Sequence, residues 1–405
     1  MNICIISLQT YVSGTVGGVS THVAQLCSIL KSTGHNVVII CPAHPEHPNE
    51  DYEEIIEEVL YFCVGNTSSS STNRHWNQKS KNVFSKLSRS YDFRCIFSEG
   101  IAGQGIIKHH NFHNIPCFCF LHNFGITHFY NLWKEVIDIN STAYYFLVTI
   151  PYLITKIIKL EIPTYRDCSL LISCSSHNAD RIHQFYRINQ KNIFVLPNWV
   201  DTSEFIPSCD SRVLARKRWK CSETDLIFLL VGSLYRPKGF HIAIKSFSTF
   251  LKQHKDACLL IAGSGRQEKE LKNFAKQFGL IEGHNIRFLG EVEHTLLPFL
   301  YNAADVFLMP SLLIEVLPYS LLEAMSCGLP FISTTNPGCR EAAGNVGILI
   351  PPANENAMIQ AMFRLAQNEE ERTQIGRLAR ERVLNRFSQG HAENSIHSIL
   401  KKIPA

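Results

Sequence analysis

The sequence predicts an α/β protein of two domains, each built on a doubly wound, mostly parallel sheet with helices on its faces. Short apolar runs typical of buried strands recur along the chain and alternate with helical patterns. This alternation starts at residue 2 and starts again at residue 226, and 405 residues are enough for two hydrophobic cores.

The N-terminal half opens with a strand, a glycine-rich turn, a helix and a second strand. We expect strands at residues 2–8, 36–41, 93–98, 115–121, 169–174 and 193–196. The turn contains Gly14, Gly17 and Gly18 and lies at the carboxyl end of the first strand, where ligands bind in such sheets. It does not spell G-x-G-x-x-G, so it is weak evidence for a nicotinamide cofactor.

The C-terminal half repeats this organisation, with strands expected at residues 226–231, 257–262, 285–289 and 305–309. Residues 309–330 follow the last of these and read MPSLLIEVLPYSLLEAMSCGLP. Pro318 suits the first position of a helix, and Gly328 with Pro330 suits its end. The free N–H groups around residues 317–320 therefore form a helix start that can hold a phosphate.

Two glutamates, Glu315 and Glu323, flank this helix start and stand eight residues apart. Phosphate repels a carboxylate, so glutamates kept near a phosphate site are suited to accept hydrogen bonds from hydroxyl groups. Phosphate between two hydroxylated groups describes a nucleotide sugar. For an arbitrary pair, solvated surface charge is the commoner explanation by roughly three to one.

The pattern E-x7-E within PSLLIEVLPYSLLEAMSCGLP closely resembles the signature of the retaining glycosyltransferases of family 4, which have the GT-B fold. GGVSTHVAQLCSILKSTGHNVVII is similar to the opening of that family, and VLPNWVDTSEFIP resembles its hinge. The resemblance implies an acceptor-side domain at residues 1–200, with a C-terminal helix at 386–405 packing back on it. Residues 201–385 would bind the nucleotide sugar.

The resemblance also assigns the catalytic positions. Glu315 would hold hydroxyls of the donor sugar. Lys238, within VGSLYRPKGF, would bind the diphosphate. The family's usual arginine aligns with Ser233, and Arg236 is the substitute that we expect. His122, directly after the strand PCFCFL, would orient the sugar.

Further positions are expected to bind the donor through backbone or ribose contacts. The paired glycines Gly17 and Gly18 would approach the diphosphate, and Glu323 would bind the ribose. The remaining positions are Gly263, Gly265, Val292, Leu317, Pro318, Tyr319 and Ser320. Glu99 stands where relatives often have a histidine, and either an acceptor contact or a helix cap is open to it.

The implied reaction moves a sugar from a UDP- or GDP-sugar to a saccharide or glycolipid acceptor with retention of anomeric configuration. No D-x-D occurs in the chain, so we expect transfer without a metal, and no metal site or cofactor is proposed. Two alternatives stay open: a non-catalytic nucleotide-sugar-binding subunit, favoured by Ser233, and a nicotinamide-dependent oxidoreductase.

Composition bounds the partners and the compartment. A dispersed net charge of +4 argues against nucleic-acid binding, and the basic residues 212–220 are interpreted as a solvated helix face. Fourteen cysteines without a framework indicate a reducing cytoplasm. Residues 143–160 are the most apolar stretch and are expected to form a buried core helix rather than a membrane-surface segment, although peripheral membrane contact stays open. Residues 66–82 are expected to form a polar, mobile loop.

Overall fold

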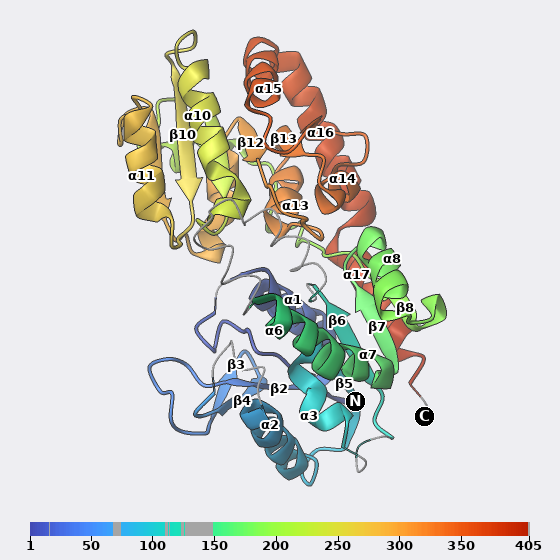
Figure 1. The fold of residues 1–405 in the computed structure, drawn as a ribbon. Helices are drawn as coiled ribbons and strands as arrows, with labels where there is room; N and C mark the ends of the chain where they lie inside the picture. The colour runs from blue at the N-terminus through green and yellow to red at the C-terminus, as the bar shows by residue number, and fades with distance from the viewer. Residues whose placement is uncertain are drawn as a thin grey trace. The chain divides into compact units, whose positions relative to one another are not determined.

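The computed structural model describes residues 1–15, 17–67, 74–109, 112, 114–122, 125 and 149–403. The chain divides into two compact units, one formed by Met1–Pro197 with Glu393–Ala405 and the other by Asn198–Ala392. Each unit contains one sheet with helices packed on it (Figure 1).

The sheet of the N-terminal unit has eight strands in the order β3-β4-β2-β1-β5-β6-β7-β8. Its neighbouring strands run parallel except for the antiparallel pair β3 and β4. The strands are β1 (Asn2–Ile6), β2 (Asn36–Pro42), β3 (Tyr52–Ile56), β4 (Val59–Val64), β5 (Phe93–Glu99), β6 (Cys117–Leu121), β7 (Leu170–Ser173) and β8 (Ile193–Val195). Strands β3 and β4 were not predicted. Strand β3 is an acidic, largely exposed edge strand, whereas β4 is apolar and mostly buried and was overlooked beside it.

Helical segments of this unit connect and cover the strands. They are α1 (Gly18–Ser32), α2 (Arg74–Leu87), η1 (Gly100–Gly103), α3 (Gln104–Ile107), α6 (Ile150–Lys156), η4 (Ile157–Glu161), α7 (Ile162–Asp167), α8 (Ser176–Tyr186) and η5 (Gln190–Asn192). Helix α17 (Gln389–Leu400) falls mostly in this unit. The ammonium of Lys402 lies 5.3 Å from the centre of the Phe194 ring.

Helix α2 corrects the prediction of a polar loop at residues 66–82. Residues 68–73 lie outside the described part, but the chain is helical from Arg74 onward. Trp76 is fully buried and its Nε1 donates a hydrogen bond to the Ala102 carbonyl at 2.7 Å. The start of this helix was missed because most residues around Trp76 are polar. The buried face of the helix depends on a few large side chains, among them Trp76 and Phe84.

The described part of the apolar stretch, residues 149–160, is helical but not buried as predicted. The first residues of the stretch, 143–148, lie outside the described part of the chain. In α6 and η4, Tyr152, Ile154 and Ile158 are 58%, 46% and 57% exposed, while Leu153 is buried. Within the described ranges, no helix combines the length and the apolar character that a membrane crossing requires.

The C-terminal unit has a six-stranded parallel sheet in the order β11-β10-β9-β12-β13-β14. Its strands are β9 (Leu226–Val231), β10 (Ala257–Ala262), β11 (Ile286–Gly290), β12 (Val306–Met309), β13 (Phe331–Thr334) and β14 (Ile348–Ile350). Alternate residues of β9 enter opposite cores: Ile227 and Leu229 join one, and Phe228 and Leu230 join the other. Both faces of the sheet are therefore buried, as the short apolar runs predicted.

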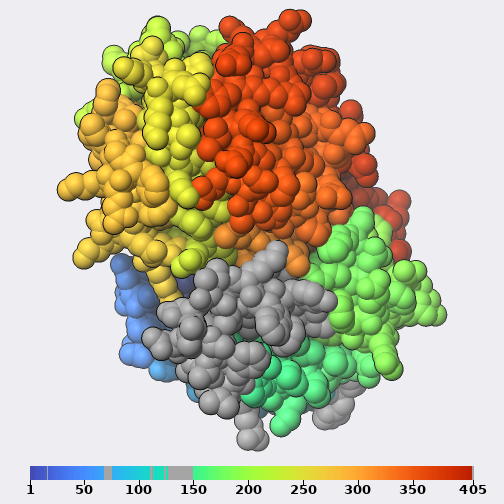
Figure 2. All heavy atoms as spheres, turned by 45° about the horizontal axis from the view of Figure 1, so that its top comes forward, coloured from blue at the N-terminus to red at the C-terminus, as the bar shows by residue number. Residues whose placement is uncertain are grey.

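Helices fill both layers of this unit. They are α9 (Cys209–Arg218), η6 (Arg236–Lys238), α10 (Phe240–Phe250), α11 (Glu268–Gln277), η7 (His294–Leu296), α12 (Leu297–Ala303), α13 (Tyr319–Ser326), α14 (Pro337–Ala343), α15 (Glu355–Gln367) and α16 (Glu369–Arg386). Figure 2 shows the yellow atoms of the α10 region beside the red-orange atoms of the α15 region. An ion pair joins these two helices, with Lys245 Nζ 2.8 Å from Glu355 Oε2.

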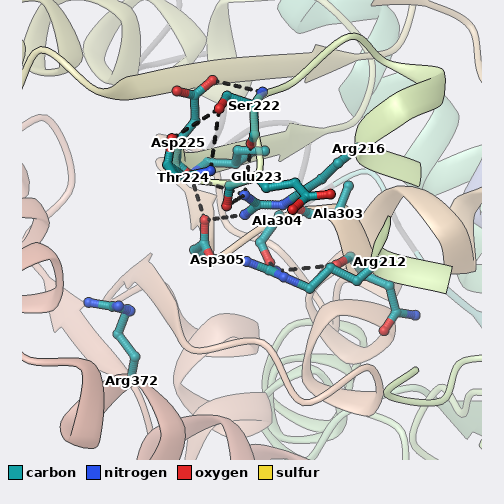
Figure 3. Close-up of polar contacts among 12 residues, drawn as sticks. Arg212, Arg216, Ser222, Glu223, Thr224, Asp225, Ala303, Ala304, Asp305 and Arg372 are labelled. Carbon is teal, nitrogen blue, oxygen red and sulfur yellow. Dashed lines mark hydrogen bonds and ion pairs between the residues drawn. The ribbon is translucent and has the colours of Figure 1, made fainter. Parts of the chain in front are cut away.

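The basic residues 212–220 were predicted to form a solvated helix face, but two of their arginines make structural contacts. Arg216 is buried, and its guanidinium pairs with the Asp305 carboxylate, Nη2 to Oδ2, at 2.8 Å (Figure 3). Arg212 binds the other oxygen of Asp305 at 2.5 Å. Arg216 also donates to the carbonyls of Ser222, Glu223, Asp225 and Ala303. These contacts tie α9 to the chain segments before β9 and β12.

The hinge-like sequence VLPNWVDTSEFIP is packed rather than solvated. Trp199, Val200 and Phe205 are essentially unexposed, and Val200 and Phe205 belong to one core of the C-terminal unit. The boundary between the two units, Pro197 to Asn198, falls inside this sequence, and the three apolar side chains that follow it are buried.

Candidate active site

Two loops at the carboxyl ends of neighbouring strands form the centre of the candidate site in the C-terminal unit. One follows β9 and contains η6, and the other follows β12. Gly239, with φ of +74°, allows them to meet, because a Cβ there would lie 2.1 Å from the Pro310 carbonyl oxygen. The Leu312 amide donates to the Pro237 carbonyl at 2.8 Å and closes the contact.

This packing brings together two predicted site residues. Lys238 Nζ donates to Glu315 Oε1 at 2.7 Å, although 77 residues separate them in sequence. The lysine side chain is 22% exposed and the glutamate side chain 14%, so the pair is mostly sheltered from water. Burial alone would lower the pKa of Lys238, but the Glu315 carboxylate outweighs burial and raises it. Lys238 is therefore a fixed positive charge at neutral pH.

The Glu315 carboxylate is oriented by more than the lysine. Ser311 Oγ donates to the same oxygen, Oε1, at 2.8 Å. The Glu315 carbonyl accepts from the Gly338 amide at 3.0 Å, and a Cβ at Gly338 would lie 2.3 Å from the Val316 carbonyl oxygen. The loop therefore rests directly on the start of α14.

The predicted helix start is present, one residue later than expected. Pro318 occupies the capping position with extended backbone, and α13 begins at Tyr319. The Asn198 side-chain amide donates to the Leu317 carbonyl at 2.7 Å and fixes the approach to the helix. The N–H groups at the start of α13 carry the positive end of the helix dipole.

Glu323 lies within α13 and is only 4% exposed. The Tyr301 hydroxyl donates to its Oε2 at 2.7 Å, and His294 Nε2 lies 3.9 Å from its Oε1. Burial raises the pKa of Glu323, although His294 and the Tyr301 hydrogen bond act in the opposite direction. Glu323 is a positioned buried acceptor rather than a solvated surface charge.

Gly263 and Gly265 form the turn after β10, against the loop after β9. A Cβ at Gly263 would lie 2.0 Å from the Gly232 carbonyl oxygen, and one at Gly265 would lie 2.4 Å from that of Leu234. The Leu234 amide donates to the Ser264 carbonyl at 2.8 Å. These glycines allow two backbone segments to pack against each other. Val292, after β11, is partly buried against the core.

Arg236 does not join the lysine and glutamate pair. It is exposed on η6, and among the described residues it makes no hydrogen bond or ion pair. Its charge acts on His241, whose pKa is lowered chiefly by burial and secondarily by Arg236. Ser233, at the position of the family arginine, is also exposed.

The predicted site residues of the N-terminal unit lie at the carboxyl ends of its strands. Gly17 caps the start of α1, Gly18 is its first residue, and His122 directly follows β6. Glu99 ends β5 and contacts two histidines: its Oε1 lies 3.0 Å from His22 Nδ1, and its Oε2 lies 2.9 Å from His122 Nε2. His122 Nδ1 lies 3.0 Å from Cys174 Sγ.

The pKa values of Glu99, His22 and His122 are all shifted from their ordinary values. Burial acts to raise the pKa of Glu99, but the two histidines prevail and hold it at about 2. Burial lowers the pKa of His22, whereas Cys174 and Glu99 overcome burial and raise that of His122. Glu99 is thus a buried carboxylate that faces two imidazole rings, and neither role considered from sequence described this arrangement.

Sequence reasoning did not identify Ser311, Tyr301, His294 or His22. Ser311 lies inside the motif, four residues before Glu315, and its spacing was a usable signal. Tyr301 and His294 reach Glu323 from 22 and 29 residues upstream through the packing of α12 and η7. His22 stands on α1, and only the fold brings it to Glu99, 77 residues away.

Comparison with known proteins agrees with this architecture. Residues 212–382 match the profile described as glycosyl transferases group 1, and residues 16–204 match that described as glycosyltransferase family 4. Mannosylfructose-phosphate synthase of Agrobacterium fabrum is 24% identical over 415 residues, covering 95% of this chain and 88% of that protein. Glycogen synthase of Mycobacterium tuberculosis H37Rv is 24% identical over 410 residues, covering 96% and 91%.

Solved structures share the fold. Sucrose-phosphate synthase from Thermosynechococcus elongatus superposes with a TM-score of 0.79 at 19% identity, covering 99% of this chain and 98% of that one. The Anabaena protein HepE, in complex with UDP-glucose, superposes with a TM-score of 0.73 at 17% identity, covering 99% and 100%. The profiles that match the two halves of the chain and the solved structures that share its fold all describe glycosyltransferases. The protein belongs to the family 4 (group 1) glycosyltransferases of the GT-B fold.

Proposed function

We propose that this glycosyltransferase moves a sugar from a nucleotide-diphosphate sugar to a saccharide or glycolipid acceptor with retention of anomeric configuration. The observation that carries the proposal is the contact between Lys238 and Glu315 beside the start of α13. One loop pair thereby presents a fixed cation for a diphosphate and a carboxylate for sugar hydroxyls.

The leaving diphosphate is stabilised by Lys238 and by the N–H groups at Leu317, Tyr319 and Ser320, next to Pro318. Fixed donors aimed at developing charge are worth most where water is excluded. These groups, in a chain without D-x-D, are proposed to make a metal unnecessary at the diphosphate. Arg236, exposed on η6 two residues before Lys238, is proposed to join them.

The sugar and the nucleoside are bound by acceptors. Glu315 takes donor-sugar hydroxyls and Glu323 takes the ribose. The backbone at Gly263, Gly265 and Val292 contacts the nucleotide. In the N-terminal unit, proposed as the acceptor side, Gly17 and Gly18 approach the diphosphate and His122 lies near the transferred sugar.

Retention of anomeric configuration rests on the family resemblance. In that family the acceptor is thought to attack the sugar face from which the diphosphate leaves, and the departing phosphate takes the acceptor's proton. The donor is proposed to be a UDP- or GDP-sugar. The HepE structure contains UDP-glucose, and a Corynebacterium glutamicum relative, 28% identical over 217 residues, is named as a GDP-mannose-dependent mannosyltransferase of a phosphatidylinositol mannoside. That name supports a glycolipid acceptor, and the name glycogen synthase supports a saccharide. Fourteen free cysteines support a cytoplasmic location.

Release of nucleoside diphosphate from UDP-glucose, GDP-mannose and ADP-glucose tests the proposal, without acceptor and then with a panel of saccharides and glycolipids. We expect one donor to be turned over by the wild type, and slow hydrolysis without acceptor already shows chemistry. Proton NMR of the product reports the anomeric configuration. No turnover of any donor, or an inverted product, would contradict the proposal.

Ser233 favours one other function, a subunit that binds the nucleotide sugar without transferring it, because the family arginine is absent there. A thermal-shift measurement separates the two, since a ligand that binds only the folded state raises the melting temperature. Stabilisation by a donor that is never hydrolysed or transferred would support the subunit. Restoring the arginine with Ser233→Arg should then create activity.

A further inference from the structure

We propose that His22, Glu99 and His122 bind one divalent transition-metal ion, zinc by preference, at the carboxyl edge of the N-terminal sheet. The three residues come from α1, the end of β5 and the position after β6. One ligand atom from each lies within 4.8 Å of the others. Nothing in the family comparisons assigns such a site.

The spacing of the ligand atoms suits one ion. Glu99 Oε1 lies 3.0 Å from His22 Nδ1, and Glu99 Oε2 lies 2.9 Å from His122 Nε2. Two ligands that bind one zinc ion at about 2.1 Å, with angles of about 90° to 110°, lie about 2.9 to 3.4 Å apart. The two histidine-to-carboxylate distances are close to this range, although each involves a different oxygen of Glu99.

Two of these atoms lack a conventional partner. His122 Nε2 and Glu99 Oε2 are buried, and within the described part of the chain neither has a hydrogen-bond partner, despite their separation of 2.9 Å. Their contact is close, but it is not aligned as a hydrogen bond. The two atoms form an ion pair when the ring is protonated, and a zinc ion would take the place of the ring proton.

The other nitrogen of His122 strengthens this interpretation. Nδ1 lies 3.0 Å from Cys174 Sγ, and when Nδ1 is protonated its N–H donates a hydrogen bond to the sulfur. Nε2 then faces the Glu99 carboxylate at 2.9 Å, where either a ring proton or a bound cation can bridge the two groups. A ligating histidine commonly donates its second ring N–H to a neighbouring acceptor in this way.

The donor set selects the metal. Two imidazoles and one carboxylate bind zinc or ferrous iron in proteins and leave coordination positions open for water. The ion would hold α1 to the ends of β5 and β6, and so would stabilise the N-terminal unit. All three ligands belong to the N-terminal unit, whereas Lys238 and α13 belong to the other unit. A sugar hydroxyl near His122 would then meet the open position rather than Nε2.

Metal content tests the site without reference to sugar transfer. The full chain is purified, stripped with a chelator, incubated with zinc chloride, desalted and analysed by inductively coupled plasma mass spectrometry. We expect one zinc per wild-type chain and none in Glu99→Gln, which keeps the shape but loses the charge. His44→Ala removes a half-exposed histidine of the same unit and should retain the zinc.

Thermal unfolding of the wild type provides a second readout that needs no variant. Zinc at one hundred times its Kd should raise the melting temperature by about 5 °C or more, and a chelator should reverse the shift. No stoichiometric zinc in the wild type, or equal zinc in Glu99→Gln, would overturn the site and leave a proton-bridged cluster. Because neither readout uses a donor, failure here is distinct from failure of the proposed transferase activity.

Discussion

The ammonium of Lys238 and the carboxylate of Glu315 lie 2.7 Å apart at the meeting point of two loops. Without a ligand, each charge neutralises the other, and Ser311 shares the carboxylate oxygen. A donor diphosphate would attract the lysine, and its sugar hydroxyls would satisfy the glutamate. The loop pair is therefore arranged before the donor binds, so little ordering remains to be done on binding.

Replacing either member of this pair should greatly slow transfer without unfolding the protein. Lys238→Ala is expected to lower kcat by about 10²–10³, the usual loss for one donor aimed at developing charge. Glu315→Ala removes the acceptor for donor-sugar hydroxyls and should lower kcat/KM strongly. The check is a steady-state assay with circular dichroism of each variant.

Lys245→Ala provides the matched control, because it breaks a lysine–glutamate pair of similar length on the surface of the same unit. It should retain activity. Full activity in Lys238→Ala or Glu315→Ala would refute the site assignment.

Glu323→Gln should stabilise the protein while weakening donor binding. Because burial raises the pKa of Glu323, there is a pH range above about 4.5 in which the folded state still holds a proton that the unfolded state has released. Wild-type stability therefore falls as pH rises from the unfolded value of about 4.5 through the raised folded value. The glutamine variant lacks this penalty and can still accept from Tyr301.

Urea unfolding at about pH 4 and about pH 8 checks this, together with calorimetric titration of the donor. The stability gain of Glu323→Gln should be present at the higher pH and absent at the lower. A variant less stable than the wild type at the higher pH, or one with unchanged donor affinity, would show that Glu323 has another role.

Arg216→Met should destabilise the C-terminal unit by about 3–5 kcal/mol, because it leaves the Asp305 carboxylate without its buried partner. It also removes the donor to four backbone carbonyls. Denaturant unfolding measures the loss. Lys217→Ala, on the exposed side of the same helix, should change stability by less than about 0.5 kcal/mol. Similar losses in both variants would contradict the structural role of Arg216.

Gly263→Ala should disturb the turn after β10 by collision as well as by backbone strain. Its Cβ would lie 2.0 Å from the Gly232 carbonyl oxygen, with φ at +135°. Gly279→Ala is the control, because φ there is +76° but a Cβ would meet nothing within 4 Å. Melting temperature and donor affinity should fall more for Gly263→Ala. Equal effects would mean that the close approach of the two turns is unimportant.

Much of the fold could be predicted from the apolar runs, because a strand buried on both faces leaves a local signature. Strands β9 and β10 were predicted with their observed bounds. Edge strand β3 escaped because its residues are acidic and exposed, and α2 escaped because its buried face depends on a few large side chains. The prediction of a buried helix at residues 143–160 failed over its described part, 149–160, because an apolar sequence does not guarantee burial.

The candidate site divides in the same way. Glu315, Lys238 and the start of α13 lie in recognisable motifs, so the sequence pointed to them directly. Tyr301, His294 and His22 act through contacts that only the packing of distant segments creates. The exposed position of Arg236 likewise depends on the conformation of η6, which a motif match could not convey.

A crystal structure with bound UDP or GDP, whichever stabilises the protein more, tests the central claim most directly. We predict a diphosphate oxygen within hydrogen-bonding distance of Lys238 Nζ and of the N–H groups at the start of α13, with Glu323 on the ribose. A diphosphate bound elsewhere, with Lys238 still paired to Glu315, would contradict this account.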